Sequence, residues 1–273
     1  MTTATKTIVA AAAWLVSLAA AHAQCTIVNT AFDAGETLKY DLYFNWKFVW
    51  VNAGTATMST DNAVWEGDKV LESKLITQTS KQLDKFFMMR DTLRSVVTTD
   101  IVPLYYKKAA NEGGKYYKDQ VWYSYRDGGV HLEQEYQNRK GEVKHYQRDR
   151  TDCVYDMMSM MLRARSFDAS SFKVNDKLMF PMADGDNVSD ITLIYRGKKN
   201  FKMRKTGVTY RCLIFSFVEY EGKKEKEIIT FYITDDANHI PVRLDMFLKF
   251  GTAKAYLNKA TGLKHECTSI IKK

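Results

Sequence analysis

This 273-residue chain has few residues that break secondary structure, and it lacks the sequence motifs of several kinds of catalytic site. Only three prolines are present, so long strands are rarely broken by a residue without a backbone N–H. No two of the four cysteines are close in sequence, which excludes a CxxC redox motif and a zinc ribbon. The GxSxG elbow, HExxH, the phosphate-binding loop, GxGxxG and the EF-hand loop are also absent. We therefore expect no cofactor and no enzyme of these families.

The one long apolar run lies near the start of the chain. The segment Ile8–Ala20 contains 13 residues, fewer than the roughly 20 that a membrane-spanning helix needs. Lys6 precedes it, and Ala21-His22-Ala23 follows as a small-x-small cleavage pattern. This arrangement predicts a signal peptide over residues 1–23 and a single β-rich domain over residues 24–273. The expected location is the periplasm or cell envelope, without a transmembrane span.

Cys25 follows the predicted cleavage site and allows an alternative, an anchored lipoprotein. The residue immediately before it is Gln24, whereas a lipidation box places a small residue there, so we favour soluble export. Export to an oxidising compartment allows the cysteines to pair. We expect Cys153 to pair with Cys212 and Cys25 with Cys267; the alternative is that some thiols stay free and buried.

The formal net charge is +8, which by itself would suit nucleic acid. An exported protein rarely meets nucleic acid, and the lysines alternate with acids, as in Glu221–Glu227 (EGKKEKE). A solvated surface of mixed sign is the better interpretation. Attraction to anionic glycans or lipid headgroups stays possible.

A period of two dominates the rest of the sequence. In 36–46 the apolar residues Leu38, Tyr40, Leu42, Phe44 and Trp46 alternate with mostly polar ones, as in a half-buried strand. The segments 208–220, 227–234 and 242–250 have similar composition, and short Gly- and Asn-containing turns separate such runs. We predict a mainly β fold, a large curved antiparallel sheet forming a half-barrel or barrel with one short helix packed on it.

The helix is expected within 152–168. Apolar residues recur at Val154, Met157, Met158, Met161 and Leu162, which is helical spacing. Asp152 is the expected N-cap. The methionine stripe is interpreted as core, because methionine fills irregular gaps, more than as a soft ligand set.

Two groups of polar residues deserve consideration as sites. His131, Glu133, Glu135 and His145 share one face if a three-residue loop joins their strands, but they equally suit an exposed ribbon. We expect no metal there.

The second group is the segment TDDANHIPV. Asp235, Asp236 and His239 resemble an acid/base set, but Asp and Asn favour turns, and Pro241 fixes the entry to the next strand. We predict that Asp235, Asp236, Asn238, His239 and Pro241 form a structural turn and that no residue of the chain is catalytic.

Five segments together resemble the exported bacterial proteins grouped as domain-of-unknown-function family 3108. The resemblance implies a periplasmic or surface location and one β-rich domain, and it brings no known activity. One departure is Tyr232, where a tryptophan is often expected. The segments are FDAGETLKYDLYFNW with AGTA (Gly35, Glu36, Leu38, Tyr40, Gly54), MRDTLRS (Arg90, Asp91), YDMMSMMLRARSFD, YRGKKNFKMRKTGVTYRC and YITDDANHIPVRLDMFLKFGTAKAYL.

Three functions follow as hypotheses. The first is a non-enzymatic binding or carrier protein with an apolar groove for a lipid, lipoprotein or glycolipid, for which Tyr40, Phe44, Trp46 and Trp50 are the candidate ligand residues. By fold-level analogy, lipoprotein carriers shelter an acyl chain on a curved sheet; alternatively, these aromatics only fill the core. The second is an envelope-assembly protein that recognises a protein or glycan through an exposed face or edge. A hydrolase is the third and least favoured.

Overall fold

The computed structural model describes residues 25–46, 49–248 and 251–271, so the predicted signal peptide lies outside the described residues. Two short helices and fifteen strands are found in this part of the chain. They are β1 (Glu36–Trp46), β2 (Val49–Trp65), β3 (Asp68–Thr79), α2 (Lys81–Asp84), β4 (Met89–Val97), β5 (Pro103–Glu112), β6 (Lys115–Arg126), β7 (Gly129–Gln137), β8 (Val143–Arg150), α3 (Met157–Arg165), β9 (Lys177–Asp184), β10 (Asn187–Lys202), β11 (Thr209–Glu221), β12 (Lys224–Thr234), β13 (Pro241–Leu248), β14 (Gly251–Thr261) and β15 (Ile270–Ile271), with a single 3₁₀ turn at Ala169–Ser171.

All the strands belong to one antiparallel sheet. Its order is β8-β7-β6-β5-β4-β3-β2-β1-β14-β13-β12-β11-β10-β9, with β15 added beside β11. Because β1 pairs with β14, the first and last long strands meet in the middle of the sheet. The predicted mainly β fold with a large curved antiparallel sheet is therefore confirmed.

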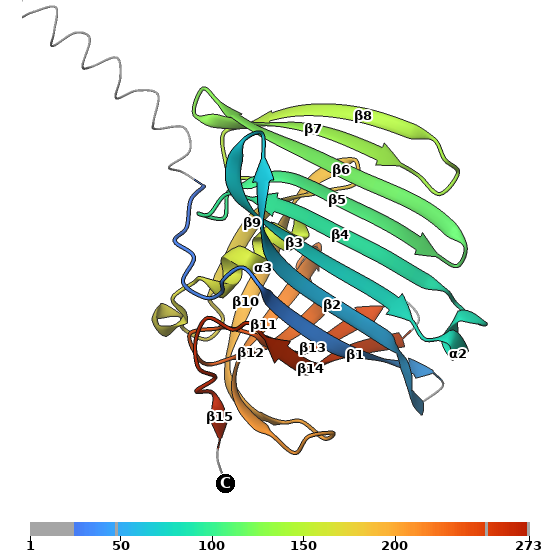
Figure 1. Ribbon diagram of the computed structural model, residues 1–273, viewed down its shortest axis with the longest axis vertical. Coiled ribbons are helices and arrows are strands. Elements are labelled where there is room, and N and C mark those ends of the chain that lie inside the picture. Colours follow the sequence, from blue (N-terminus) through green and yellow to red (C-terminus); the bar gives the residue numbers. More distant parts are fainter. Residues whose placement is uncertain (1–24, 47–48, 249–250, 272–273) are drawn as a thin grey trace, which may run out of the picture.

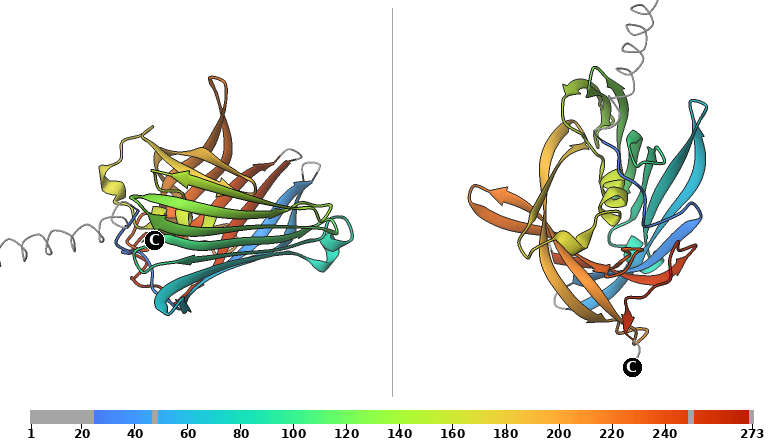
Figure 2. Two further views of the ribbon diagram at one scale, coloured as in Figure 1. Left: turned by 90° about the horizontal axis from the view of Figure 1, so that it is seen from above. Right: turned by 90° about the vertical axis from the view of Figure 1, so that its left-hand side faces the viewer.

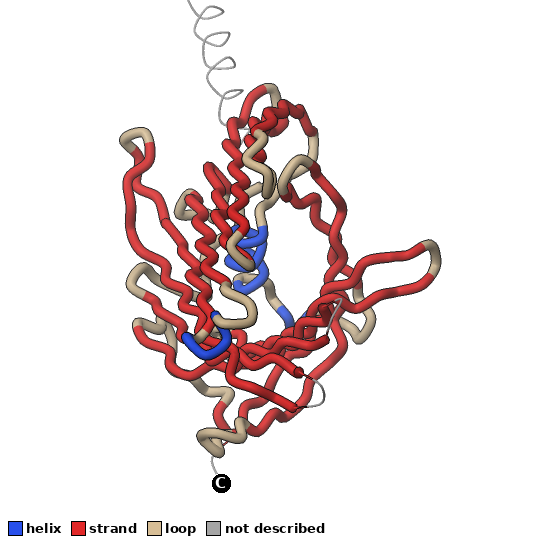
Figure 3. The backbone as a smooth tube through the Cα atoms, turned by 90° about the vertical axis from the view of Figure 1, so that its right-hand side faces the viewer, coloured by secondary structure: helices blue, strands red, loops and turns tan. Residues whose placement is uncertain are grey.

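The sheet curls into a half-barrel that does not close through backbone pairing. Strands β1–β8 form one wall, strands β9–β14 form the other, and α3 lies between them (Figures 1 and 2). Seen end-on, the strands surround α3 (Figure 3). Side chains of β7 and β8 reach the turn between β9 and β10: Gln134 Nε2 on β7 donates to Gly185 O at 3.1 Å, and Arg148 on β8 donates to Asp186 O.

Helix α3 starts later than the sequence predicts. Tyr155 still forms a bridge with Met182 on β9, so the chain stays extended until Asp156. The Asp156 carboxylate accepts hydrogen bonds from the N–H groups of Met158 and Ser159, both at 2.9 Å. The predicted N-cap at Asp152 is wrong; that side chain pairs with Arg150.

The helix fills one end of the half-barrel, which we call the plugged end. Met158 and Leu162 are fully buried there, as the core interpretation of the methionine stripe requires. The N-terminal segment crosses the same end and buries Ala31 and Phe32 completely. Burial of these apolar side chains supplies much of the driving force for folding.

The disulfide joins the N-terminal segment to the approach of α3. Cys25 and Cys153 are bonded across a sequence separation of 128 residues. The predicted pairs Cys153–Cys212 and Cys25–Cys267 are wrong, because Cys212 lies in β11, buried as a free thiol, while Cys267 is a half-buried free thiol. Arg163 of α3 also donates to Cys25 O at 2.8 Å. Such a disulfide is typical of a protein of an oxidising, extracytoplasmic compartment.

No helix in the described ranges is long and apolar enough to span a bilayer.

Candidate ligand-binding face at the open end

The TDDANHIPV segment forms the connection between β12 and β13. Asp236 Oδ1 accepts from Thr234 Oγ1 at 2.8 Å and from Asn238 N at 3.1 Å, and its Oδ2 accepts from Ser269 N at 3.2 Å. Burial by itself would raise the pKa of Asp236, but hydrogen bonds led by those from Thr234 and Ser269 outweigh it, and the pKa is lowered. The carboxylate therefore holds the turn and the C-terminal segment together as an anion.

The same turn supports a buried ion pair at the plugged end. Arg165, at the end of α3, donates to both carboxylate oxygens of Glu36 at 2.5 and 2.8 Å and to Asn238 O at 3.0 Å. Both charged side chains are at most 2% exposed. His239 Nδ1 lies 2.6 Å from Arg165 O. A bidentate pair with this many additional bonds is well satisfied, so three segments of the family resemblance meet in one structural contact.

The remaining aspartate of the turn is also occupied. Asp235 accepts from Lys198 Nζ at 3.0 Å, and Arg211 Nε lies 3.6 Å from it. A depression of about 220 Å³ borders the turn. Asp235, Asp236 and His239 Nδ1 are therefore all engaged in contacts that hold the turn in place.

The histidines of β7 and β8 lie on a ribbon with the register that a three-residue loop predicts. Glu135 pairs with His145, and His131 Nδ1 lies 2.7 Å from Asp149 Oδ1. The His145 side chain is largely exposed. In the described part of the chain, no group of three or more His, Cys, Asp or Glu side chains is arranged to hold a metal ion.

The candidate ligand aromatics do not share one surface. Tyr40 is buried in the core, and Phe44 lies further along the same face of β1 and is half-buried. A bulge between Leu42 and Tyr43 shifts the pairing with β2, so that Phe44 faces Val51. Trp50 therefore lies on the outer face, where Lys254 Nζ is 4.3 Å from its ring. This corrects the prediction of a common groove; the side chain of Trp46 lies outside the described residues.

The concave face at the end away from α3, which we call the open end, carries an apolar wall. Cross-strand partners lie on the same side of a sheet, and the pairings Phe44–Ala253, Met246–Ala253 and Leu75–Leu93 place these residues beside one another. Leu93 is buried, whereas Phe44, Leu75 and Met246 are only half-buried. The apolar wall, defined as Phe44, Leu75, Met89, Leu244, Met246 and Ala253, is therefore partly accessible to solvent.

A charged strip continues the concave face next to the apolar wall. It contains Asp91 of β4, Lys108 of β5 and Asp119 of β6. Lys108 pairs with Asp119 across the strands, and its positive charge acts to lower the pKa of both carboxyl groups, so the three side chains share one face. Burial is the main cause that raises the pKa of Asp91 and of Asp119 to about 6. The negative charge of Glu112 raises the pKa of Asp91 further, and that of Asp184 on β9 raises the pKa of Asp119 further.

Both carboxylates of the charged strip leave an oxygen without a partner. Asp119 is only 3% exposed, and neither Asp119 Oδ1 nor Asp91 Oδ1 has a hydrogen-bond partner among the described residues. Unsatisfied buried acceptors are costly in a protein interior. They are suited to receive a donor, such as a hydroxyl or ammonium group, from a bound molecule.

The sequence contained a weak signal for the charged strip. Asp119 stands at an inward position of an alternating run, between Tyr117 and Val121. A polar residue at a core position of such a run marks either a satisfied network or a site. Alternation by itself does not say which face of β6 is concave, so the sequence alone does not identify Asp119 as a site residue.

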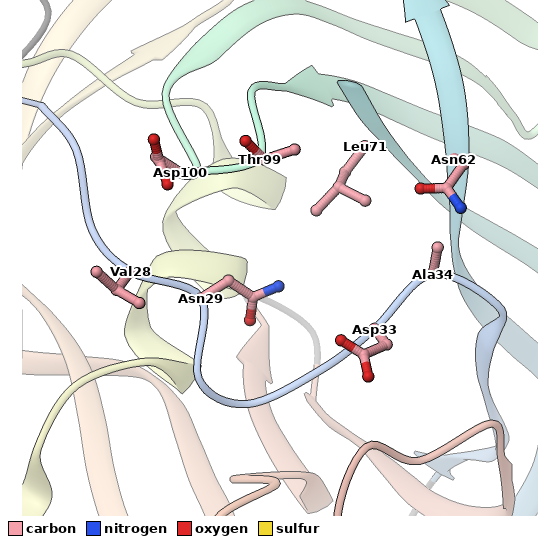
Figure 4. A pocket seen from close by; sticks show the side chains of 8 residues that line it. All are labelled: Val28, Asn29, Asp33, Ala34, Asn62, Leu71, Thr99 and Asp100. Atoms are coloured by element: carbon pink, nitrogen blue, oxygen red, sulfur yellow. The ribbon is translucent and has the colours of Figure 1, made fainter. Parts of the chain in front are cut away.

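A second depression, of about 480 Å³, lies at the plugged end beside the N-terminal segment (Figure 4). Its polar side chains serve the local backbone: Asn29 Nδ2 donates to Phe32 O at 2.9 Å, and Asn29 Oδ1 accepts from Ala31 N and Phe32 N. Val28 at its border is exposed. This depression is better explained as the border of the plug than as a ligand site.

Comparison with known proteins identifies the family. The model of the family described as Protein of unknown function (DUF3108) matches residues 39–258. The chain belongs to this family. A search among functionally curated proteins finds no match.

Two solved structures resemble this DUF3108 protein. A crystal structure of a β-barrel-like protein of the domain of unknown function DUF1849 from Brucella abortus has a TM-score of 0.51 and 10% identity, over 86% of this chain and 100% of that one. A putative exported protein with a YmcC-like fold from Bacteroides fragilis has a TM-score of 0.31 and 9% identity, over 87% and 100%. Only the first TM-score exceeds 0.5, and at 10% identity it shows a shared barrel-like fold.

Proposed function

We propose that this DUF3108 protein is a non-enzymatic binding or carrier protein of the periplasm or envelope that holds an amphipathic molecule on the concave face of its open end. The observation that supports this most is the contrast within that face. The half-buried apolar wall suits an acyl chain, and the charged strip beside it offers unpaired carboxylate oxygens to a headgroup with hydroxyl or ammonium donors. Lipids, lipoproteins and glycolipids combine these two parts.

The apolar wall can bind a ligand through burial of apolar surface alone, without covalent chemistry. Covering the half-exposed side chains of the apolar wall contributes roughly 25 cal/mol per Å² of apolar surface removed from water. The carboxylates then determine orientation more than affinity, because a donor from the ligand replaces a missing bond. Retention of a chain by the wall and recognition of a headgroup by the strip would together select an amphipathic ligand.

The test combines native mass spectrometry of the protein from its own periplasm with uptake of a fluorescent fatty acid. We expect co-purified lipid mass and saturable uptake. Leu75→Gln should reduce uptake about tenfold, because it places an amide in the apolar wall. Ile76→Gln is the matched control, because Ile76 is adjacent to Leu75 in β3 but points to the other side of the sheet, where it is 47% exposed.

A second variant guards against loss of folding. Ala253→Trp fills the concave face without removing core contacts and should also block uptake, while its melting temperature stays close to that of the parent protein. A protein that is always empty and takes up no fatty acid would exclude the proposal. Equal uptake by Leu75→Gln, Ile76→Gln and the parent would exclude this face as the site.

A second candidate function is recognition of a protein or glycan partner in envelope assembly, favoured by a cluster on the outer face. The guanidinium of Arg243 lies 4.6 Å from the ring centre of Tyr232, 5.1 Å from that of Phe201 and 5.8 Å from that of Tyr256. These four side chains are half-buried, and aromatic residues with arginine are typical of binding hot spots. A photo-cross-linker in place of Tyr256 should capture one reproducible envelope partner; the same group in place of Ile76 is the control, and equal yields would exclude the idea.

A further inference from the structure

The border of the open end carries an unusual number of exposed apolar side chains. They come from three segments: the start of β2, the loop after α2 and the end of β13. We call them the apolar rim. It consists of Val49, Trp50, Phe86, Phe87, Phe247 and Leu248, whose exposed fractions range from 41% to 82%.

These segments form one border. Strand β1 lies between β2 and β14, and β14 pairs with β13, so the start of β2 and the end of β13 lie in the same part of the sheet. The loop with α2 is held beside β2 by the bond from Ser80 N to Ala53 O at 2.9 Å. Figures 1 and 2 show the start of β2, the loop after α2 and the end of β13 at the same end of the half-barrel, away from α3. Exposed apolar groups gathered in this way mark an interaction surface.

The charge around the apolar rim indicates the occupant. Lys81 is the first residue of α2, Lys85 follows the helix, and Lys115 starts β6 at the same end. Each is exposed and forms no ion pair with an acidic side chain among the described residues. The acid of α2, Asp84, is neutralised by Arg90 through two bonds. A cationic border around protruding aromatic and aliphatic groups is complementary to an anionic lipid surface.

We infer that the apolar rim docks the protein on an anionic membrane surface, with the open end toward the lipid. Phe86 and Phe87 enter the boundary between headgroups and acyl chains, and the lysines contact the headgroups. This surface is distinct from the concave face, so docking does not require that the concave face holds a ligand. Docking would nevertheless place the apolar wall where an amphipathic molecule enters or leaves a bilayer.

The experiment is flotation of the purified mature protein with large vesicles. Vesicles of phosphatidylcholine with phosphatidylglycerol are compared with vesicles of phosphatidylcholine alone, at low and at high salt. We expect the protein to float with the anionic vesicles, to stay below with the neutral ones, and to be released by high salt, because surface charges are screened.

The variants separate the rim from the rest of the surface. The double change Phe86→Asp with Phe87→Asp should lower the bound fraction about tenfold, and Lys81→Glu with Lys85→Glu should remove the preference for anionic vesicles. Val64→Asp is the control, since Val64 is 71% exposed on β2 at the opposite end. Circular dichroism and melting temperature show that each variant is folded.

Three results would overturn the inference. One is absence of the parent protein from the floating fraction with anionic vesicles, and another is flotation of the Phe86/Phe87 variant to the same extent as the parent. The third is an equal loss in the Val64 variant. Fatty-acid uptake is measured in parallel. Normal uptake with lost flotation of the Phe86/Phe87 variant supports separate sites, whereas a parent protein that floats with anionic vesicles but takes up no fatty acid counts against the concave face only.

Discussion

The plugged end and the open end of the half-barrel differ in how their buried charged side chains are hydrogen-bonded. At the plugged end, Arg165 and Glu36 satisfy each other, and Asn238 O accepts the remaining donors of the guanidinium. At the open end, Asp91 and Asp119 keep an unpaired oxygen, and burial raises the pKa of each to about 6. Folding by itself favours the first arrangement and disfavours the second. The difference suggests that the open end is shaped by something other than stability.

Removing the buried arginine should have the largest effect. Arg165→Ala leaves the Glu36 carboxylate buried without its partner, so we expect the free energy of unfolding to fall by about 3–5 kcal/mol in urea titrations. Arg163→Ala on the same helix is the control, because it removes one bond to Cys25 O and should cost about 1 kcal/mol. The double change Arg165→Met with Glu36→Leu should recover most of the loss; a loss below 1 kcal/mol for Arg165→Ala would show that the pair is not a stabilising element.

Loss of the disulfide should loosen the plugged end next. Cys25→Ser opens a loop of 128 residues and should lower the free energy of unfolding by about 2–4 kcal/mol, since the unfolded chain gains freedom. Cys267→Ser changes a free thiol and should have little effect. Urea midpoints with and without a reductant provide the measurement, and identical midpoints for the parent protein would contradict the expected role.

The two neighbouring aspartates of the β12–β13 turn should differ. Asp236→Ala removes acceptors for Thr234, Asn238 and Ser269 and should cost about 1–3 kcal/mol in thermal or urea unfolding. Asp235→Ala removes ion pairs with partly exposed partners, so the free energy of unfolding should fall by less than about 1 kcal/mol. If Asp236→Ala abolished an activity or phenotype while its melting temperature stayed unchanged, the turn would be a catalytic site after all.

The smallest effect is a pH dependence at the open end. Below about pH 4 the Asp119 carboxyl is protonated in both the folded and the unfolded chain. Between about pH 4 and 6 the unfolded chain loses this proton while the folded protein retains it, because burial raises the pKa of Asp119 to about 6. The contribution of Asp119 to stability therefore falls as the pH rises through this window.

Asp119→Asn tests that sign. The variant should match the parent near pH 4 and be more stable at pH 7, by on the order of 1–2 kcal/mol, in urea unfolding at a series of pH values. Asp61→Asn, at an exposed position of β2, is the matched control. A variant less stable than the parent at pH 7 would show that the carboxylate is satisfied and that the two ends do not differ as described.

Much of the fold was readable from local patterns, and the errors have local causes. The alternation of Leu38, Tyr40 and Leu42 predicted β1 correctly, but the bulge after Leu42 moved Trp50 to the outer face. Helical spacing located α3, whereas the bridge between Tyr155 and Met182 delayed its start. Both differences arise from pairing with another strand, and the periodicity of a single segment carries no information about that partner.

The candidate site was harder to predict for the same reason. Lys108 and Asp119 are eleven residues apart and meet only because β5 and β6 pair in one particular register. Asp184 approaches them from the far half of the chain because the sheet curls. Aromatic residues attracted attention in the sequence, but Tyr40 proved to be core.

The sequence by itself determined that this protein is built of antiparallel strands with one substantial helix, that it belongs with DUF3108, and that TDDANHIPV connects strands, because these properties depend on short-range periodicity and turn chemistry. Only the tertiary structure decided that Cys25 pairs with Cys153, that Arg165 finds Glu36, and that Asp91 and Asp119 share a concave face with an apolar wall. These depend on register, bulges and curvature of a sheet that pairs residues as far apart in sequence as Thr37 and Thr261. Periodicity within one segment contains no information about partners so distant.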